Sequence, residues 1–98
     1  MAKRVWFENA NGEERVIKNT ANTWAEVNEA IKAFIRRCNV NKHNEAKRIY
    51  GDQYDPSKVQ EFKWNYTRCW KQEDGRIKID VGSHTEFFLW EGEIENDS

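Results

Sequence analysis

The sequence predicts an α+β domain built on a single antiparallel β-sheet of about five strands, with one main amphipathic helix packed on one face. Two runs of alternating apolar residues, 62–70 and 77–81, predict a hairpin, because side chains of a strand alternate between its two faces. A capped stripe of apolar residues over 24–38 predicts the helix. The expected order is two strands, the helix, a second shorter helix, and three strands.

The first hairpin is predicted by two strand-forming segments that flank a strong turn signal. Residues 3–8 (KRVWFE) and 15–18 (RVIK) favour strands. Between them lies the segment 9–12 (NANG), and an Asn-Gly pair favours a hairpin turn because both residues tolerate a positive φ. The two segments are therefore expected to pair antiparallel.

The main helix is predicted to begin at Thr23. Its hydroxyl is placed to cap free backbone N–H groups, and Glu26, three residues on, completes a capping box. The apolar residues that follow recur every three or four positions, so they share one face that is expected to lie on the sheet. This stripe comprises Trp24, Val27, Ile31, Phe34, Ile35 and Cys38.

Residues 39–61 carry weaker signals. We expect a second, shorter helix around residues 44–50, followed by an irregular connection. Pro56 is the one proline of the chain, and it should hold Asp55 out of helical geometry.

The last three strands carry most of the aromatic side chains. Closing the second hairpin with Lys71 opposite Arg76, or with Glu73 opposite Arg76, places the aromatic row of 62–70 over the aliphatic row of 77–81. Burial of both rows is expected to fix this register, because a one-residue slip would turn the aromatic rings to the polar face. A final strand is expected over residues 85–90.

The predicted core contains Trp24, Trp64, Tyr66 and Trp70. One helix covers only one face of a sheet, so the other face should stay open or partly covered. Some of Trp6, Phe88 and Trp90 are expected on that open face.

The chain of 98 residues is expected to form one domain, residues 1–98, with an acidic tail, 91–98, that frays. Only 38% of the residues are hydrophobic, so large aromatic side chains, among them five Trp, must supply much of the buried surface. The net charge of −1 gives no overall field that would favour nucleic acid or a membrane.

The two cysteines, Cys38 and Cys69, lack the spacing of a redox or metal motif and are expected to be free thiols. Cys69 is expected on the polar side of its strand, facing the same way as Asp80. No apolar run has the length of a signal-peptide core or a membrane span. We expect a soluble protein of the cytoplasm.

No residue pattern predicts an enzyme, a metal site or a cofactor. Ser83, His84 and Asp80 lie within five residues of one another, and their side chains are not expected to converge in the order of a catalytic triad. Cys69 lacks a basic neighbour that would activate its thiol. Two isolated histidines do not make a metal site.

A basic segment is the main candidate for a binding surface. Residues 32–48 hold six bases against one acid, Glu45, whereas residues 86–97 hold five acids and no base. The functional interpretation of the segment is a surface for an acidic protein groove or a phosphate backbone, and the alternative is a solvated helix end without a partner. With two aromatic residues that anchor interfaces, the candidate site is Lys32, Arg36, Arg37, Lys42, Lys47, Arg48, Trp6 and Trp90.

The run D-x-G-S-H-T-E-F-F, at residues 80–88, resembles the C-terminal part of small uncharacterised proteins encoded by bacterial phages and mobile elements. The resemblance covers residues 64–92 and carries no catalytic residues. It implies a small, intracellular, non-enzymatic protein that docks on a host protein, and anti-CRISPR inhibitors of host defence nucleases are of this type. The alternative is a nucleic-acid-binding module that uses the 32–48 segment and exposed aromatic rings.

Overall fold

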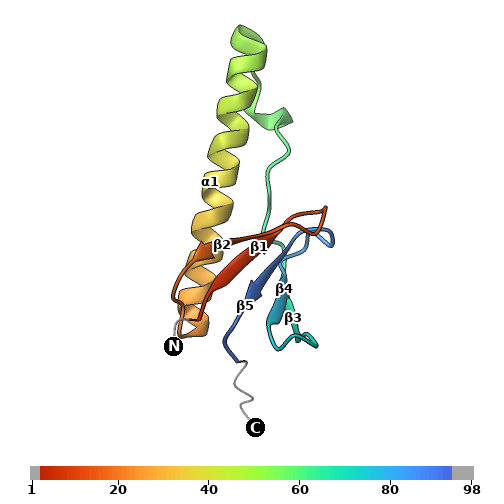
Figure 1. Cartoon of the computed structure of the whole chain (residues 1–98). Coiled ribbons are helices and arrows are strands. Elements are labelled where there is room, and N and C mark those ends of the chain that lie inside the picture. Colours follow the sequence, from red (N-terminus) through yellow and green to blue (C-terminus); the bar gives the residue numbers. More distant parts are fainter. Residues whose placement is uncertain (1–2, 94–98) are drawn as a thin grey trace.

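The structure is a computed structural model, and it describes residues 3–93. These residues form one five-stranded antiparallel sheet and one α-helix (Figure 1), which confirms the predicted fold class. The elements are β1 (Val5–Glu8), β2 (Glu14–Lys18), α1 (Trp24–Tyr50), the short 3-10 helices η1 (Gly51–Gln53) and η2 (Pro56–Lys58), β3 (Arg68–Lys71), β4 (Ile77–Asp80) and β5 (Phe87–Trp90). Their spatial order in the sheet is β2-β1-β5-β4-β3.

The first hairpin forms as its turn signal predicts. The side-chain oxygen of Asn9 accepts hydrogen bonds from the backbone N–H groups of Asn11 (2.9 Å) and Glu13 (3.0 Å). Gly12 adopts a φ of +83°, a conformation that glycine takes without steric cost. The turn thereby sets Glu8 opposite Glu14 and aligns β1 with β2.

Helix α1 begins as predicted and ends later than predicted. The hydroxyl of Thr23 accepts a hydrogen bond of 3.2 Å from the backbone N–H of Glu26. The helix then runs for 27 residues to Tyr50, so the expected separate helix over residues 44–50 is wrong: it is the end of the same helix. Gly51, with a φ of +54°, ends it.

Asn39 explains why the helix does not break where the sequence turns polar. Its side chain donates to the backbone carbonyl of Phe62 (2.9 Å) and accepts from the backbone N–H of the same residue (2.7 Å). An asparagine whose side chain is engaged elsewhere does not compete for the helix backbone, which is the usual reason that asparagine weakens helices.

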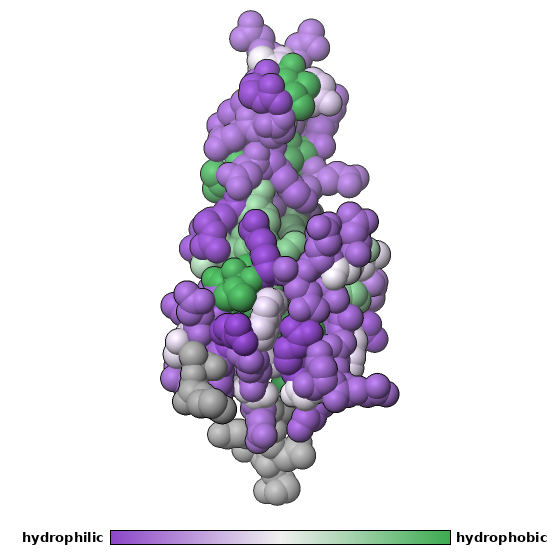
Figure 2. All heavy atoms as spheres, viewed as in Figure 1, coloured by the Kyte–Doolittle hydropathy of each residue, from purple (hydrophilic) through white to green (hydrophobic). Residues whose placement is uncertain are grey.

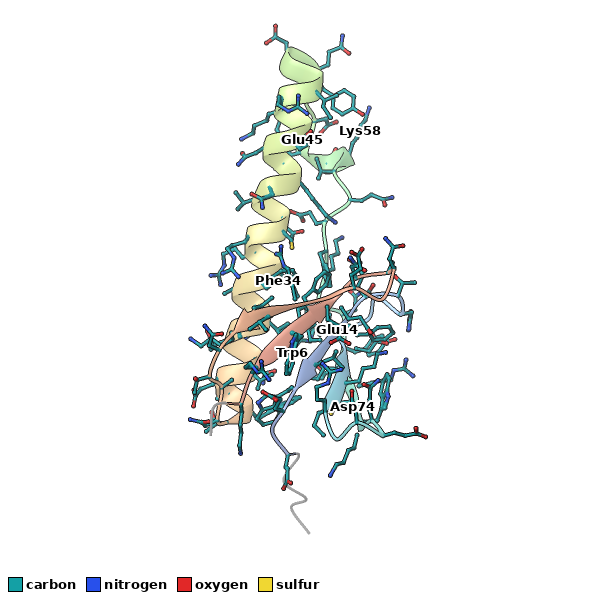
Figure 3. The ribbon with its side chains drawn as sticks, in the orientation of Figure 1. Trp6, Glu14, Phe34, Glu45, Lys58 and Asp74 are labelled. Carbon is teal, nitrogen blue, oxygen red and sulfur yellow. The ribbon has the colours of Figure 1, made fainter. Side chains whose placement is uncertain are left out.

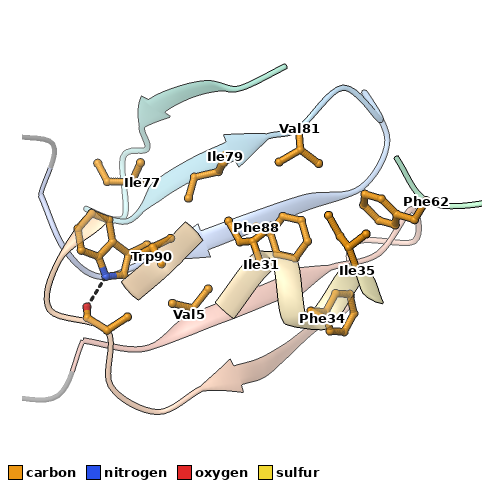
Figure 4. Close-up of a cluster of buried hydrophobic side chains, with 12 residues drawn as sticks. Val5, Ile31, Phe34, Ile35, Phe62, Ile77, Ile79, Val81, Phe88 and Trp90 are labelled. Carbon is orange, nitrogen blue, oxygen red and sulfur yellow. Dashed lines mark hydrogen bonds between the residues drawn. The ribbon is translucent and has the colours of Figure 1, made fainter. Parts of the chain in front are cut away.

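The hydrophobic core lies between α1 and one face of the sheet (Figure 4). Phe34 of α1 packs edge-on against Phe88 of β5, with ring centroids 5.7 Å apart. The indole N–H of Trp90 donates a 2.8 Å hydrogen bond to the carbonyl of Ala21, just before the helix begins. The buried apolar side chains are Val5, Ala21, Val27, Ile31, Phe34, Ile35, Phe62, Ile77, Ile79, Val81, Phe88 and Trp90.

The hairpin of β3 and β4 has neither of the two predicted registers. Trp70 lies opposite Lys78, and Cys69 lies opposite Ile79. The turn decides this register, because Gln72 pairs with Arg76 through a 2.8 Å backbone hydrogen bond. This is the one-residue slip that burial was expected to exclude, and only Arg68–Lys71 of the predicted 62–70 strand is a strand.

The slip changes which aromatic residues are buried. Tyr66 and Trp70 are 41% and 40% exposed, Trp24 is 36% exposed, and Trp64 is half-buried beside the core, so the predicted aromatic core is wrong. Phe88 and Trp90 fill the core instead, together with the aliphatic side chains of β4. The rings of β5 occupy the space under α1, so the ring of Trp70 in β3 stays outside the core.

The open face of the sheet is the one that α1 does not cover. Of Trp6, Phe88 and Trp90, some were expected on this face. Trp6 lies on it and is half-buried, whereas Phe88 and Trp90 are buried on the other face. Their neighbours Phe87 and Leu89 point to the open face, because residues alternate along β5.

The molecule is elongated, with extents of 53 × 25 × 23 Å. A helix of 27 residues is about 40 Å long, and the sheet lies beside only its N-terminal part (Figure 1). The C-terminal half of α1 therefore projects beyond the sheet, and the chain returns alongside it (Figure 1). Of the predicted acidic tail, Glu91 is held by an ion pair with Arg4 and Gly92 is buried, so the tail does not fray from its first residue; residues 94–98 lie outside the described part.

Replacing Phe88 should lower the free energy of unfolding far more than replacing Tyr66, which precedes β3. Phe88→Ala should reduce the free energy of unfolding by about 3–5 kcal/mol, because it removes a fully buried ring and leaves a cavity. Tyr66→Ala, at an exposed site, should cost about 1 kcal/mol or less. Urea titrations of the two variants test this, and equal losses would contradict the core described above.

Candidate functional site

The projecting end of the molecule consists of residues 39–50 of α1 and the return segment, residues 51–62. The two are joined by hydrogen bonds. Asn39 binds Phe62 at the base, and the amino group of Lys42 donates to the carbonyl of Gln60 at 3.1 Å. These contacts hold the return segment along one side of the helix.

His43 makes the central contact of the projecting end. One ring nitrogen lies 2.5 Å from the hydroxyl of Tyr54, and the other lies 2.8 Å from the carboxylate of Glu61. The rings of His43 and Tyr54 meet edge to face, with an interplanar angle of 86°. Polar contacts therefore replace, in this half of the helix, the apolar packing that the sheet provides in the other half.

All six bases of the predicted surface lie on α1, and all are exposed. Four of them have internal contacts: Lys32 with Glu29 (3.9 Å), Lys42 with Gln60, Arg48 with Glu45, and Lys47 over the ring of Tyr54 (5.5 Å). Within residues 3–93, Arg36 and Arg37 have no ion-pair partner.

The structure brings five of these bases into one broad band. At about 100° per residue, Lys32, Arg36 and Lys47 fall within about 60° of one another around the helix axis. Arg37 and Arg48 continue the band on the side away from the sheet. Lys42 is the exception, because it points to the return segment. We call the five outer residues the basic band.

The projecting end also exposes apolar side chains, which the sequence analysis did not single out. Val40, Ile49 and Tyr50 are 52%, 59% and 62% exposed. Figure 2 shows hydrophobic patches between hydrophilic side chains at this end, and Figure 3 marks it by Glu45 and Lys58. Ile49 lies on the same side of α1 as the apolar stripe, but past the end of the sheet, so it is exposed.

A hollow of about 410 Å³ lies beside Tyr50, between the helix end and the return segment. The apolar parts of Tyr50, Tyr54 and Val59 line it together with Lys58. Exposed aromatic rings next to bases are the residue types that anchor protein interfaces.

The two tryptophans of the predicted site do not join the basic band. Trp90 is 2% exposed and bonded to Ala21, so its predicted role in partner binding is wrong. Trp6 lies on the open face of the sheet, on the other side of the molecule from α1, where its ring is between the guanidinium groups of Arg4 (4.9 Å) and Arg76 (4.8 Å).

Asp80 and His84 come closer than the sequence analysis expected. Asp80 is fully buried, and its carboxylate accepts from Arg68 (3.0 Å) and from the backbone N–H groups of Gly82 (2.8 Å) and His84 (3.3 Å). Nδ1 of His84 is 3.3 Å from Asp80. The hydroxyl of Ser83 instead bonds to Thr85 and Glu86, so the order of a serine triad is not formed.

His84 holds a strained backbone position, with a φ of +66°. Its ring lies 2.9 Å from the hydroxyl of Tyr66, and its backbone N–H bonds to Asp80. The cluster thus fixes the corner between β4 and β5 and ties it to β3 through Arg68. The chemistry of these contacts is that of a structural carboxylate whose lone pairs are satisfied.

Both cysteines are free and half-buried. Burial raises the pKa of the Cys38 thiol and of the Cys69 thiol above the ordinary value. Cys69 faces α1 and packs beside the core, so its expected place on the polar side, together with Asp80, is wrong for the same one-residue slip. Neither thiol has the lowered pKa of a reactive cysteine.

Among residues 3–93, no three His, Cys, Asp or Glu side chains are grouped closely enough to hold a metal ion. The helix that the structure describes lacks the apolar length needed to cross a membrane.

Comparisons with known proteins give no family for this chain. No protein-family model, curated protein or solved structure matches it.

Stability should fall in acid because of Asp80. Burial by itself would raise the pKa of this carboxyl, but the hydrogen bonds from Gly82, Arg68 and His84 outweigh burial and lower it. A lowered folded pKa gives stability that is present above the unfolded pKa of about 4 and is lost as pH falls through the folded value. Asp80→Asn should cost roughly 1.5–3 kcal/mol at pH 7.

The test is urea unfolding of both proteins between pH 2 and pH 7. The deficit of Asp80→Asn should shrink as pH falls below about 4, because the parent then loses the same charge. A deficit that stays constant over this range would show that the Asp80 charge does not contribute.

Proposed function

We propose that this protein is a non-enzymatic binding protein that docks, through the projecting end of α1, on an acidic surface of a partner protein. The observation that carries the proposal is the outer side of α1, where the basic band runs onto the projecting end beside the exposed side chains of Val40 and Tyr50. Bases beside apolar anchors fit a groove with carboxylates at its rim.

The charge distribution supports the same site. Residues 36–48 of α1 hold five bases and one acid, a balance of +4, although the net charge of the whole chain is −1. The return segment, residues 51–62, holds one base and three acids, so the positive charge lies on the helix and not on the whole projecting end. Such an arrangement orients the molecule as it approaches an acidic partner.

Nucleic acid is the second candidate partner, and the basic band is the observation that favours it. Of the rings that could stack on a base, Trp6 lies on the opposite side of the molecule and Trp90 is buried, which leaves the exposed Tyr50 as a single ring beside the band. The protein partner is therefore the better fit to the arrangement of side chains.

The proposal extends to the type of partner. The resemblance of residues 80–88 to small phage and mobile-element proteins supports a host protein as the target, reached in the cytoplasm. The size of the chain and its lack of a catalytic pattern support a stoichiometric inhibitor, with a host defence nuclease as the most specific target, as in anti-CRISPR proteins.

Reversing the charge of the band should abolish partner binding while leaving the fold intact. In the triple variant Arg36→Glu, Arg37→Glu and Lys47→Glu, the affinity for a protein captured from nuclease-treated host lysate should fall by about tenfold or more. These side chains are exposed and make no contact with the core, so the melting temperature should change little.

A matched control has the same change in net charge at exposed bases elsewhere: Lys18→Glu, Lys63→Glu and Lys71→Glu. This variant should keep most of the affinity. Equal losses in the two triple variants would show that overall charge, and not the basic band, governs binding.

Titration against DNA and RNA separates the two candidate partners. We expect no binding tighter than ~10 μM at physiological salt, because few bases of the band are free to neutralise phosphates. Sub-micromolar binding that weakens steeply with salt, by roughly 0.7 to 0.9 log units per log unit of salt for each phosphate contacted, would favour the nucleic-acid function instead.

A further inference from the structure

A row of side chains crosses all five strands on the open face of the sheet. The registers place Val16 of β2 beside Trp6 of β1, Trp6 beside Leu89 of β5, Leu89 beside Lys78 of β4, and Lys78 beside Trp70 of β3. Val16 and Trp70, at the two ends of the row, are exposed, and Leu89 at its centre is fully buried by its neighbours. We call these five residues the central row.

The bases on this face already have partners on the same face. Arg76 pairs with Glu14 (2.8 Å), Lys78 with Glu8 (2.9 Å), Arg4 with Glu91 (3.1 Å) and Arg68 with Asp80 (3.0 Å). The same bases cover aromatic rings, since Arg4 and Arg76 flank Trp6, and Lys78 lies 4.3 Å above the ring of Phe87.

This pairing determines the chemistry of an occupant. A phosphate chain would gain little, because each of these four bases would first have to leave a carboxylate. An occupant that presents a charge would leave it unpaired against the aromatic rings. An apolar surface without charges fits, because the face offers Trp and Arg, residue types enriched at the centres of protein interfaces, with their polar groups satisfied.

The size of the face determines the shape of an occupant. Five strands at about 4.8 Å spacing span about 24 Å, and three rows of side chains span about 20 Å, which gives a footprint of roughly 500 Å². A stable interface with a second copy of this chain needs about 800 Å² from each partner. A helix about 10 Å wide covers a length of 24 Å with about 16 residues, so it fits.

We infer that the open face of the sheet is a second docking surface, and that it binds an amphipathic helix of a partner protein through an uncharged apolar stripe laid on the central row. Such a helix would make a third layer, opposite α1. This surface is independent of the basic band, since it lies on the other side of the sheet.

The tryptophan indoles provide the measurement. The probe is a synthetic 18-residue amphipathic helix with Leu on one face and equal numbers of Glu and Lys on the other. In NMR spectra of the ¹⁵N-labelled protein, the indole N–H signals of Trp6 and Trp70 should shift with saturation. The signals of Trp90, whose indole is bonded to Ala21, and of Trp64, whose indole is bonded to Thr67, should not shift.

Three variants then locate the surface. Val16→Glu and Trp70→Glu, at the two exposed ends of the row, should each weaken binding of the peptide by about tenfold or more. Ala25→Glu, at an exposed position in the first turn of α1 and outside both docking surfaces, should change it by less than about twofold and serves as the control for added charge. Both row variants lie on edge strands, and the unshifted Trp90 signal reports that they are folded.

Four results would overturn the inference. They are the absence of any shift up to about 1 mM peptide, shifts at Trp64 or Trp90 in place of Trp6 and Trp70, the same Trp6 and Trp70 shifts on adding an oligouridine, and the same shifts on concentrating the protein without peptide. The third result would assign the face to single-stranded RNA, and the fourth would assign it to a second copy of the chain.

Discussion

Strand β5 is the part of the structure on which the rest depends. It lies between β1 and β4, so it joins the N-terminal hairpin to the C-terminal one by pairing on both edges. On one face it supplies Phe88 and Trp90, which fill the core under α1, and the indole of Trp90 also anchors the chain just before the helix. On the other face it supplies Leu89, around which the open face is built. A segment of four residues thus fixes both layers and both hairpins.

Turns, caps and elements that depend on a few neighbouring residues could be predicted from the sequence. The strand register could not, because it depends on which of several distant segments fills the core. The Asn-Gly turn, the cap at Thr23 and the sheet with one helix on it follow from signals a few residues long. The register of β3 on β4 was predicted on the assumption that the rings of 62–70 fill the core. Large rings occur both in 62–70 and in 85–90, and only the folded arrangement shows that Phe88 and Trp90 occupy the space assigned to Trp64 and Trp70.

The candidate site was predicted in part. The six bases could be placed on α1 or just beyond it because charge is visible in sequence, and five of them share its outer side. Trp90 was predicted at the surface and is buried. In a strand, neighbouring residues face opposite sides, so an error of one residue exchanges core for surface. The exposure of Ile49 and Tyr50 could not be foreseen, because it follows from a sheet that ends before the helix does. Helix length could not be predicted either, because the bond that occupies the Asn39 side chain is made to Phe62, far along the chain.

The mismatch in length between helix and sheet divides the molecule into two regions of different cooperativity. The half of α1 that covers the sheet is tied to the global unfolding reaction by its buried apolar residues, whereas the projecting half is held by a few polar contacts around His43. Amide hydrogens of the projecting half would thus exchange with solvent by local opening, without disruption of the sheet. Substitutions there can reshape the outer surface at little cost to the core, so this part of the chain is free to change its recognition properties while the fold is retained.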